Sequence, residues 1–295
     1  MYTVYNLYFF KSRVCEGNDT ALGVHLPLSH KKTMKLFAKK SLGQHFLNSP
    51  RAVETIVSVA GIKRGDIVLE IGPGTGILTR ALLDQGAKVV AVEKDHRAWA
   101  MLGVIFNSEL REGKLQLLEG DILDPGLDPP KGPYMIVANI PYYITGMILE
   151  KFLEYDPRPQ KMVILVQKEV AKRIIARDKK ESILSVSVKV FGKPKILASV
   201  SRGSFIPIPR VDSAILVIEN ISDKLLAEKN LTSQAFFNIL KAGFTHKRKY
   251  AIRNLEIVIP APKLNQIWLD LGLNPKIRAE DISVTQWLQI TSLVT

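Results

Sequence analysis

The polar residues best suited to chemistry follow short apolar stretches of the chain. The stretch 66–71 runs directly into the glycine loop Gly72-Pro73-Gly74-Thr75-Gly76. Glycines between a strand and a helix let the backbone turn sharply and approach a ligand at the carboxyl ends of parallel strands. Glu93 ends the next apolar stretch, where a carboxylate can accept hydrogen bonds from a ribose diol. The pattern predicts a nucleoside-binding edge.

A third stretch, 115–119, is followed by Asp121 and Ile122. Asp121 is placed to accept a hydrogen bond from the exocyclic amine of an adenine, and Ile122 to pack on its ring. An alternative for Asp121 is a residue that forms a turn, because aspartate is common in turns.

The main alternative for the glycine loop is a nicotinamide dinucleotide site. That fingerprint needs G-x-G-x-x-G, and Ile77 stands at the position of its third glycine. The observed G-x-G-x-G spacing suits a less phosphate-dependent nucleoside better. The chain also shows no obvious proton donor for hydride transfer, so an oxidoreductase is disfavoured.

The turn 139–142, Asn-Ile-Pro-Tyr, follows the apolar stretch 134–138. The amine of adenine is a poor nucleophile because its lone pair is delocalised into the ring. The Asn139 side-chain oxygen and the Ile140 carbonyl could each accept one N–H and favour a pyramidal nitrogen. Tyr142 offers a ring for base stacking, worth about 1–3 kcal/mol. The turn therefore predicts methylation of an exocyclic amine without a general base.

A second wall for an extruded base is expected from the proline-rich stretch 204–209. This stretch presents one aromatic residue, Phe205. The alternative is that Phe205 is a core residue beneath the loop.

An alternating pattern of helices and strands is predicted to position these residues. Helices are predicted at 52–60, 77–85, 96–106, 147–153 and 168–177, and strands at 66–71, 88–93, 115–119, 134–138, 162–166, 186–190 and 214–219. Such alternation is typical of a doubly wound α/β domain with a mostly parallel sheet. We expect this domain to span 34–220 and a small all-helical domain to span 221–295. Residues 1–33 show no sustained period and are expected to be a poorly ordered extension, or the product of a start codon upstream of Met34.

Charge points to a polyanionic partner. The 295 residues carry a formal net charge of +13, which favours nucleic acid before an anionic membrane. The single cysteine, Cys15, excludes a disulfide framework and a thiolate metal site. No apolar run approaches the roughly 20 residues that cross a bilayer. We expect a monomeric cytoplasmic protein with no metal.

The basic residues concentrate in 241–253, which contains no acid. This segment interleaves Phe244 and Tyr250 with the candidate RNA-binding residues Lys241, Lys247, Arg248, Lys249 and Arg253. Cations of this kind contact phosphates, and aromatic rings anchor the segment or stack on bases. The alternative is an ordinary solvated face.

Several motifs occur together in a specific order. They lie at 40–47 (Lys-Ser-Leu-Gly-Gln-His-Phe-Leu), 70–74, 92–93, 120–121, 139–142, 166–171, 204–214 and 244–249. Together they resemble the ribosomal RNA adenine dimethyltransferase family, which includes the kasugamycin-resistance enzymes. The resemblance implies a Rossmann-like class I methyltransferase fold with a seven-stranded sheet.

The resemblance also implies a cofactor, S-adenosylmethionine, and a set of contacts. The implied contacts are His45, Leu47, Gly72, Glu93, Asp121 and Asn139; Gly74 and Ile122 join them from the loop and the adenine pocket. It implies dimethylation of two adjacent adenosines near the 3′ end of 16S ribosomal RNA, in an assembling 30S particle. His45 stands where relatives often carry Asn, and the segment 178–182 departs from the family pattern.

Three alternatives within nucleic-acid biology stay open. The family also contains enzymes that modify large-subunit RNA, although the proline-rich loop and the C-terminal domain favour the small-subunit branch. A DNA adenine methyltransferase would use the same turn chemistry. The chain could also act mainly as a non-catalytic ribosome-assembly factor.

Overall fold

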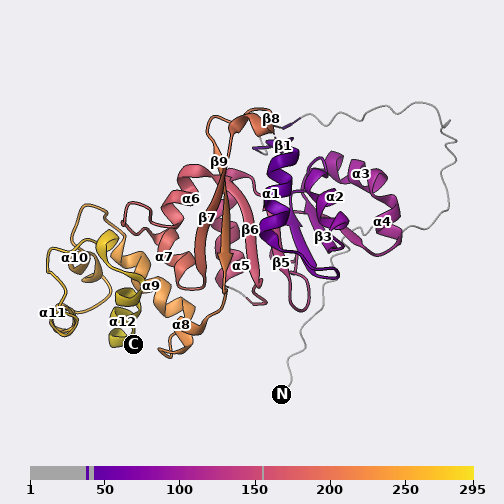
Figure 1. Ribbon diagram of the computed structural model, residues 1–295. Coiled ribbons are helices and arrows are strands. Elements are labelled where there is room, and N and C mark those ends of the chain that lie inside the picture. The colour runs from indigo at the N-terminus through magenta and orange to yellow at the C-terminus, as the bar shows by residue number, and fades with distance from the viewer. Residues whose placement is uncertain (1–37, 40–42, 155) are drawn as a thin grey trace, which may run out of the picture. The chain divides into compact units, whose positions relative to one another are not determined.

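The computed structural model describes residues 38–39, 43–154 and 156–295 (Figure 1). The predicted extension 1–33 lies outside these residues. The chain forms two compact units: one runs to Pro141 and includes Gly203–Pro209, and the other comprises Tyr142–Arg202 and Arg210–Thr295. The domain boundary expected after residue 220 stays a prediction.

The first unit contains a parallel sheet in the order β4-β3-β2-β5. Its strands are β2 (Ile67–Ile71), β3 (Lys88–Glu93), β4 (Leu115–Glu119) and β5 (Met135–Asn139). The helices are α1 (Pro50–Ala60), α2 (Ile77–Asp84), α3 (His96–Ile105) and α4 (Asn107–Arg111). Val68, Ile136 and Val137 are fully buried. Parallel strands are covered on both faces, which explains why these stretches are continuously apolar.

Local signals fix the helix that precedes the sheet. Ser49 caps α1 by accepting a hydrogen bond from the Ala52 backbone N at 3.3 Å, and Pro50 occupies the first turn. Gly61, at φ 65°, ends the helix in the left-handed conformation.

A two-stranded antiparallel ladder joins distant parts of the first unit. β1 (Phe46–Leu47) pairs with β8 (Phe205–Ile206), with Phe46 opposite Ile206 and Leu47 opposite Phe205. The Asn48 backbone N also donates to the Ser204 carbonyl oxygen at 2.8 Å. The ladder ties the proline-rich stretch to the residues that follow Gln44.

The second unit begins with an antiparallel sheet in the order β6-β9-β7. Its strands are β6 (Lys161–Gln167), β7 (Lys193–Val200) and β9 (Ser213–Glu219), and its first helices are α5 (Thr145–Glu154), α6 (Lys168–Ile174) and α7 (Ile183–Lys189). The helices after β9 are α8 (Lys224–Ala227), α9 (Ser233–Gly243), α10 (Ala251–Leu255), α11 (Ala261–Asp270) and α12 (Val284–Val294), with a 3-10 turn at Ala279–Asp281. The prediction of a helical C-terminal region is confirmed (Figure 1).

The strand predicted at 186–190 is wrong, because these residues belong to α7 and its C-terminal cap. Ser182 and Ser185 form a reciprocal capping box that starts the helix. Val186, Val188 and Val190 are all buried, so their spacing of two imitated a strand. The strand of this region is β7, and its alternating half-buried pattern went unpredicted.

Candidate active site

The glycine loop lies between β2 and α2, and two of its glycines are required by packing. A Cβ on Gly74 would lie 2.9 Å from the Phe46 ring, and one on Gly76 would lie 2.7 Å from the Phe106 ring. All three loop glycines have positive φ, 68° at Gly72, 57° at Gly74 and 82° at Gly76. A Cβ on Gly72 would meet nothing within 4 Å. The loop is thus packed on one side and open at Gly72, which suits a closely approaching ligand.

Glu93 holds the glycine loop in place. Its Oε2 accepts a hydrogen bond from the Gly74 backbone N at 3.0 Å, and its Oε1 accepts one from the Asp95 backbone N at 2.8 Å. The side chain is buried, and this burial raises the pKa of Glu93. A carboxylate oxygen has two lone pairs, so these contacts leave acceptor capacity for a ribose diol.

Asp121 lies at the same edge of the sheet as Glu93. Glu93 is opposite Glu119 in the β3–β4 ladder, and the Gly120 backbone N donates to the Glu93 carbonyl oxygen at 3.0 Å. Asp121 Oδ1 accepts from the Leu123 backbone N at 3.0 Å, and its Oδ2 lies 2.7 Å from Lys94 Nζ. The structure brings the two predicted carboxylates together and adds a lysine that the sequence did not single out. Ile122, the residue after Asp121, is buried.

Asn139 ends β5, and its amide has a defined orientation. Its Nδ2 donates to the His45 carbonyl oxygen at 3.0 Å. A carbonyl can only accept, so the amide cannot be reversed without placing two oxygens together. The Asn139 Oδ1 atom is therefore turned away from His45, as an acceptor for an incoming amine requires.

His45 links three parts of the first unit. Its Nδ1 lies 2.8 Å from the Pro207 carbonyl oxygen, an acceptor, so Nδ1 carries the hydrogen. Its own carbonyl orients Asn139. Leu47, two residues later, is 4% exposed. The structure places His45 beside Asn139, and Leu47 lies two residues further along, on β1. The contacts of both residues with a cofactor stay predictions.

Phe205 is fully buried on β8, opposite Leu47. This is the core position that the alternative interpretation gave it. Stacking on a base would require its ring to become accessible, so its role as a wall stays a prediction.

Tyr142 belongs to the second unit, in the 3-10 turn Tyr142–Ile144. Its hydroxyl lies 2.7 Å from Ser213 Oγ, and Ser213 is fully buried. The Thr145 hydroxyl donates to the Tyr142 carbonyl oxygen at 3.1 Å. Burial raises the pKa of Tyr142, which keeps the phenol neutral. Sequence reasoning missed Ser213, although it lies in the 204–214 motif.

The predicted RNA-binding residues gather around one turn of the second unit. All five are exposed: Lys241 at the end of α9, Lys247, Arg248 and Lys249 in the turn, and Arg253 in α10. Buried Asn254 holds this turn, because its Nδ2 donates to the Gly243 and His246 carbonyl oxygens at 2.6 and 3.1 Å.

The two aromatic residues of this turn differ in their surroundings. The Phe244 ring packs 5.7 Å from that of Trp287, so it anchors the turn. Tyr250 is 40% exposed and remains available for stacking.

The described residues offer neither a candidate metal site nor a candidate membrane span. They contain no group of three or more His, Cys, Asp or Glu side chains that could hold a metal ion. No helix within residues 38–39, 43–154 and 156–295 is long and apolar enough to cross a membrane.

Comparisons with known proteins assign the family. The family model for ribosomal RNA adenine dimethylase matches residues 36–295. The ribosomal RNA small subunit methyltransferase A of Dehalococcoides mccartyi strain BAV1 is 36% identical over 260 residues, which cover 86% of this chain and 88% of the relative. That of Nostoc sp. strain PCC 7120 is 37% identical over 272 residues, 87% of this chain and 97% of the relative.

Solved structures agree with this assignment. A dimethyladenosine transferase from Plasmodium falciparum has a TM-score of 0.69 and 29% identity, over 83% of this chain and 96% of that one. The 23S rRNA methyltransferase ErmE has a TM-score of 0.65 and 24% identity, over 84% of this chain and 99% of that one, and shares the fold. The predicted Rossmann-like methyltransferase fold and the resemblance are thus confirmed. The chain belongs to the ribosomal RNA adenine dimethylase family and is an S-adenosylmethionine-dependent methyltransferase.

Proposed function

We propose that the chain dimethylates the exocyclic amine of two adjacent adenosines near the 3′ end of 16S ribosomal RNA, on an assembling 30S particle. The small-subunit enzymes at 36% and 37% identity support this substrate. The observation that carries the chemistry is the Asn139 amide, whose Nδ2 is engaged by the His45 carbonyl so that Oδ1 faces the other way. The enzyme acts as a monomer in the cytoplasm, where a chain with one cysteine stays reduced.

Asn139 and Ile140 prepare the nucleophile. The Asn139 Oδ1 atom and the Ile140 carbonyl oxygen each accept one hydrogen of the adenine amine. Two acceptors outside the ring plane withdraw the nitrogen lone pair from conjugation and aim it at the incoming methyl group. Because the His45 carbonyl already orients the Asn139 amide, little reorganisation is required at the moment of reaction.

The cofactor fits the edge formed by β2, β3, β4 and β5. Gly72 would give it room, Gly74 and Glu93 would shape the loop and accept from the ribose, and Asp121 and Ile122 would flank the adenine. His45, just before β1, Leu47 on β1 and Asn139 at the end of β5 would complete the set. The bound cofactor supplies an electrophilic methyl group on a sulfonium that leaves as a neutral thioether.

The remaining proton needs no dedicated base. As the new N–C bond forms and the S–C bond breaks, the amine nitrogen becomes positively charged and strongly acidic. It passes a proton to water, and a second cycle repeats the transfer. The contribution of the protein is orientation of the amine and exclusion of other geometries.

Tyr142 and Phe205 would hold the base, and the cations around the Asn254 turn would hold the RNA. The Tyr142 hydroxyl is fixed by Ser213, which sets the plane of its ring for stacking. Lys241, Lys247, Arg248, Lys249 and Arg253 would contact phosphates, which gives affinity without reading sequence.

The decisive experiment measures where methyl groups go. The protein is incubated with labelled S-adenosylmethionine and, separately, undermethylated small subunits, large subunits and duplex DNA, and modified nucleotides are mapped. We expect N6,N6-dimethyladenosine at two adjacent positions of the small-subunit RNA only. Labelling confined to large subunits or DNA would overturn the proposed substrate.

Asn139→Ala tests the chemistry in the same assay. Loss of the oriented acceptor should lower turnover by about a hundredfold or more, with S-adenosylmethionine affinity changed only a few-fold. Asn107→Ala, on the exposed helix α4, is the matched control. Near-normal turnover of Asn139→Ala would refute the assigned role. Full subunit maturation by this inactive variant in cells would support a non-catalytic assembly role.

A further inference from the structure

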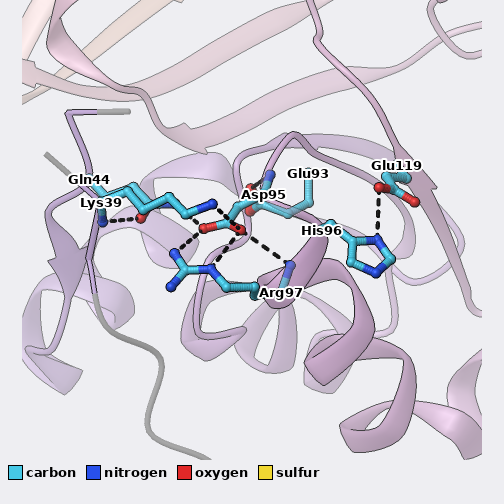
Figure 2. A network of polar contacts seen from close by, with 7 residues as sticks. All are labelled: Lys39, Gln44, Glu93, Asp95, His96, Arg97 and Glu119. Atoms are coloured by element: carbon cyan, nitrogen blue, oxygen red, sulfur yellow. Dashed lines mark hydrogen bonds and ion pairs between the residues drawn. The ribbon is translucent and has the colours of Figure 1, made fainter. Parts of the chain in front are cut away.

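A polar network fastens the residues before β1 to the start of α3 (Figure 2). Gln44 Nε2 donates to Asp95 Oδ2 at 3.1 Å. The Lys39 backbone N donates to Gln44 Oε1 at 2.8 Å, and Lys39 Nζ lies 3.7 Å from Asp95 Oδ1. The side chain of Gln44 thus has both its donor and its acceptor engaged.

Asp95 is a fixed, buried anion. It is 2% exposed and caps α3 through the Arg97 backbone N. The Arg97 guanidinium meets it through two atoms, Nε at 3.1 Å from Oδ1 and Nη2 at 2.6 Å from Oδ2. Arg97 holds the pKa of Asp95 well below its usual range, so the carboxylate stays charged. It is a strong acceptor for Gln44, because hydrogen bonds to ionised groups exceed neutral ones in strength.

Asp95 is also linked to the glycine loop, through its backbone N and the Glu93 carboxylate. The Asp95 backbone N donates to Glu93 Oε1, and Glu93 Oε2 accepts from the Gly74 backbone N. The Phe46 ring packs so closely on Gly74 that no Cβ would fit there. Asp95 therefore connects the segment 43–47 with the carboxylate and the loop that shape the cofactor site.

We propose that Gln44 and Asp95 form a latch that holds 43–47 against the glycine loop and thereby sets the affinity for S-adenosylmethionine. Both are positioning residues, because they act through His45, Leu47 and Glu93. The proposal rests on the cofactor site described under the proposed function. A latch of this kind predicts a defect in cofactor binding that saturating cofactor overcomes.

Gln44→Glu is the sharpest single change, because it keeps the size of the side chain and replaces the amide donor with a carboxylate beside Asp95. The dissociation constant of S-adenosylmethionine, measured by calorimetry without RNA, should rise about tenfold to a hundredfold, the range for loss of one hydrogen bond to a charged group. KM for the cofactor should rise in parallel, while kcat at saturation stays within about twofold. Gln266→Glu is the matched control, because Gln266 Nε2 donates to Asp270 Oδ1 at 2.7 Å on exposed α11.

A double variant in which the amide and the carboxylate exchange positions distinguishes loss of the latch from a general loss of folding. Asp95→Asn keeps the cap of α3, because asparagine caps helices as well as aspartate. In the double variant Q44E/D95N the new amide at position 95 can donate to the new carboxylate at position 44, so the hydrogen bond returns with its direction exchanged. The amide nitrogen that replaces Oδ2 no longer accepts from Arg97 Nη2, a loss that the single variant Asp95→Asn shares and that the comparison therefore cancels. We expect the double variant to bind cofactor more tightly than either single variant, a non-additivity typical of residues in direct contact.

A measurement made without cofactor tests whether the latch holds the segment 43–47 in place. Amide hydrogen exchange of 44–48 in the ligand-free protein should be faster in Gln44→Glu and return toward the original rate in the double variant. Wild-type affinity in Gln44→Glu, a fall in kcat at unchanged KM, or additive losses in the double variant would each overturn the latch. A wild-type protein that binds no S-adenosylmethionine would overturn the cofactor site itself.

Discussion

Glu70 lies on β2, two positions before the glycine loop, and is 1% exposed. Its Oε2 atom has no hydrogen-bond partner in the part of the chain that the structure describes. Burial, together with the nearby Glu93 carboxylate, raises the pKa of Glu70 from 4.5 to about 8. Glu70 therefore keeps its proton in the folded protein at neutral pH.

This raised pKa makes the folded state less stable as pH rises. Below pH 4.5 Glu70 is protonated in both the folded and the unfolded chain, so it contributes no pH dependence. Between that pH and about 8 only the unfolded chain ionises, and the free energy of unfolding falls. A shift of this size corresponds to about 5 kcal/mol at most, at about 1.4 kcal/mol per pKa unit.

Glu70→Gln removes this dependence, because a neutral amide of nearly the same size replaces the protonated carboxyl. Urea denaturation followed by circular dichroism, from pH 5 to pH 9, measures the free energy of unfolding of both proteins. The stability of Glu70→Gln relative to wild type should increase steadily up to about pH 8 and then level off. Using the difference between the two proteins cancels the contribution of the titrating groups that do not interact with Glu70.

Glu54→Gln, on the exposed face of α1, is the matched control and should show no such trend. A constant difference between Glu70→Gln and wild type across the whole pH range would refute the reasoning. It would mean that Glu70 ionises in the folded protein as readily as in the unfolded chain.

Three further changes test other parts of the molecule. Gly243→Ala forces a methyl group into a buried tryptophan ring of α12 and should lower stability by about 1–3 kcal/mol, measured by thermal melting. Ser213→Ala releases the Tyr142 hydroxyl and should lower kcat by about tenfold, the effect of about one hydrogen bond, without weakening cofactor binding in calorimetry. Lys247→Ala and Arg248→Ala should each reduce the salt dependence of RNA binding by slightly less than one unit of slope in titrations.

Sequence alone predicted the strands of the first unit because parallel strands are buried on both faces. β2, β3, β4 and β5 are rich in apolar residues, and each ends in a polar or glycine signal. The same rule failed at α7, where a short buried helix carries β-branched residues at a spacing of two. Periodicity cannot separate these cases when the buried residues of a short helix recur at a spacing of two.

The candidate site also contains residues that the sequence predicted and contacts that it did not predict. The loop and the residues at strand ends were predicted, because strand order places them at one edge. Gln44 and Asp95 are 51 positions apart, and Tyr142 and Ser213 are 71 apart, so their pairing depends on tertiary structure. Gln44 belongs to the motif 40–47, but this motif does not indicate that its side chain binds Asp95.

The two-residue strand β1 depends on a partner that is made much later. The Pro207 carbonyl that His45 contacts follows it by 162 positions in the chain. At about 5–20 residues per second, that length takes roughly 10–30 s to synthesise. During this interval a growing polypeptide can already form the β2–β5 sheet, while the segment that closes over Gly74 still lacks the β8 ladder. A nascent chain should therefore acquire its affinity for the methyl donor in a late step, once the proline-rich stretch has emerged.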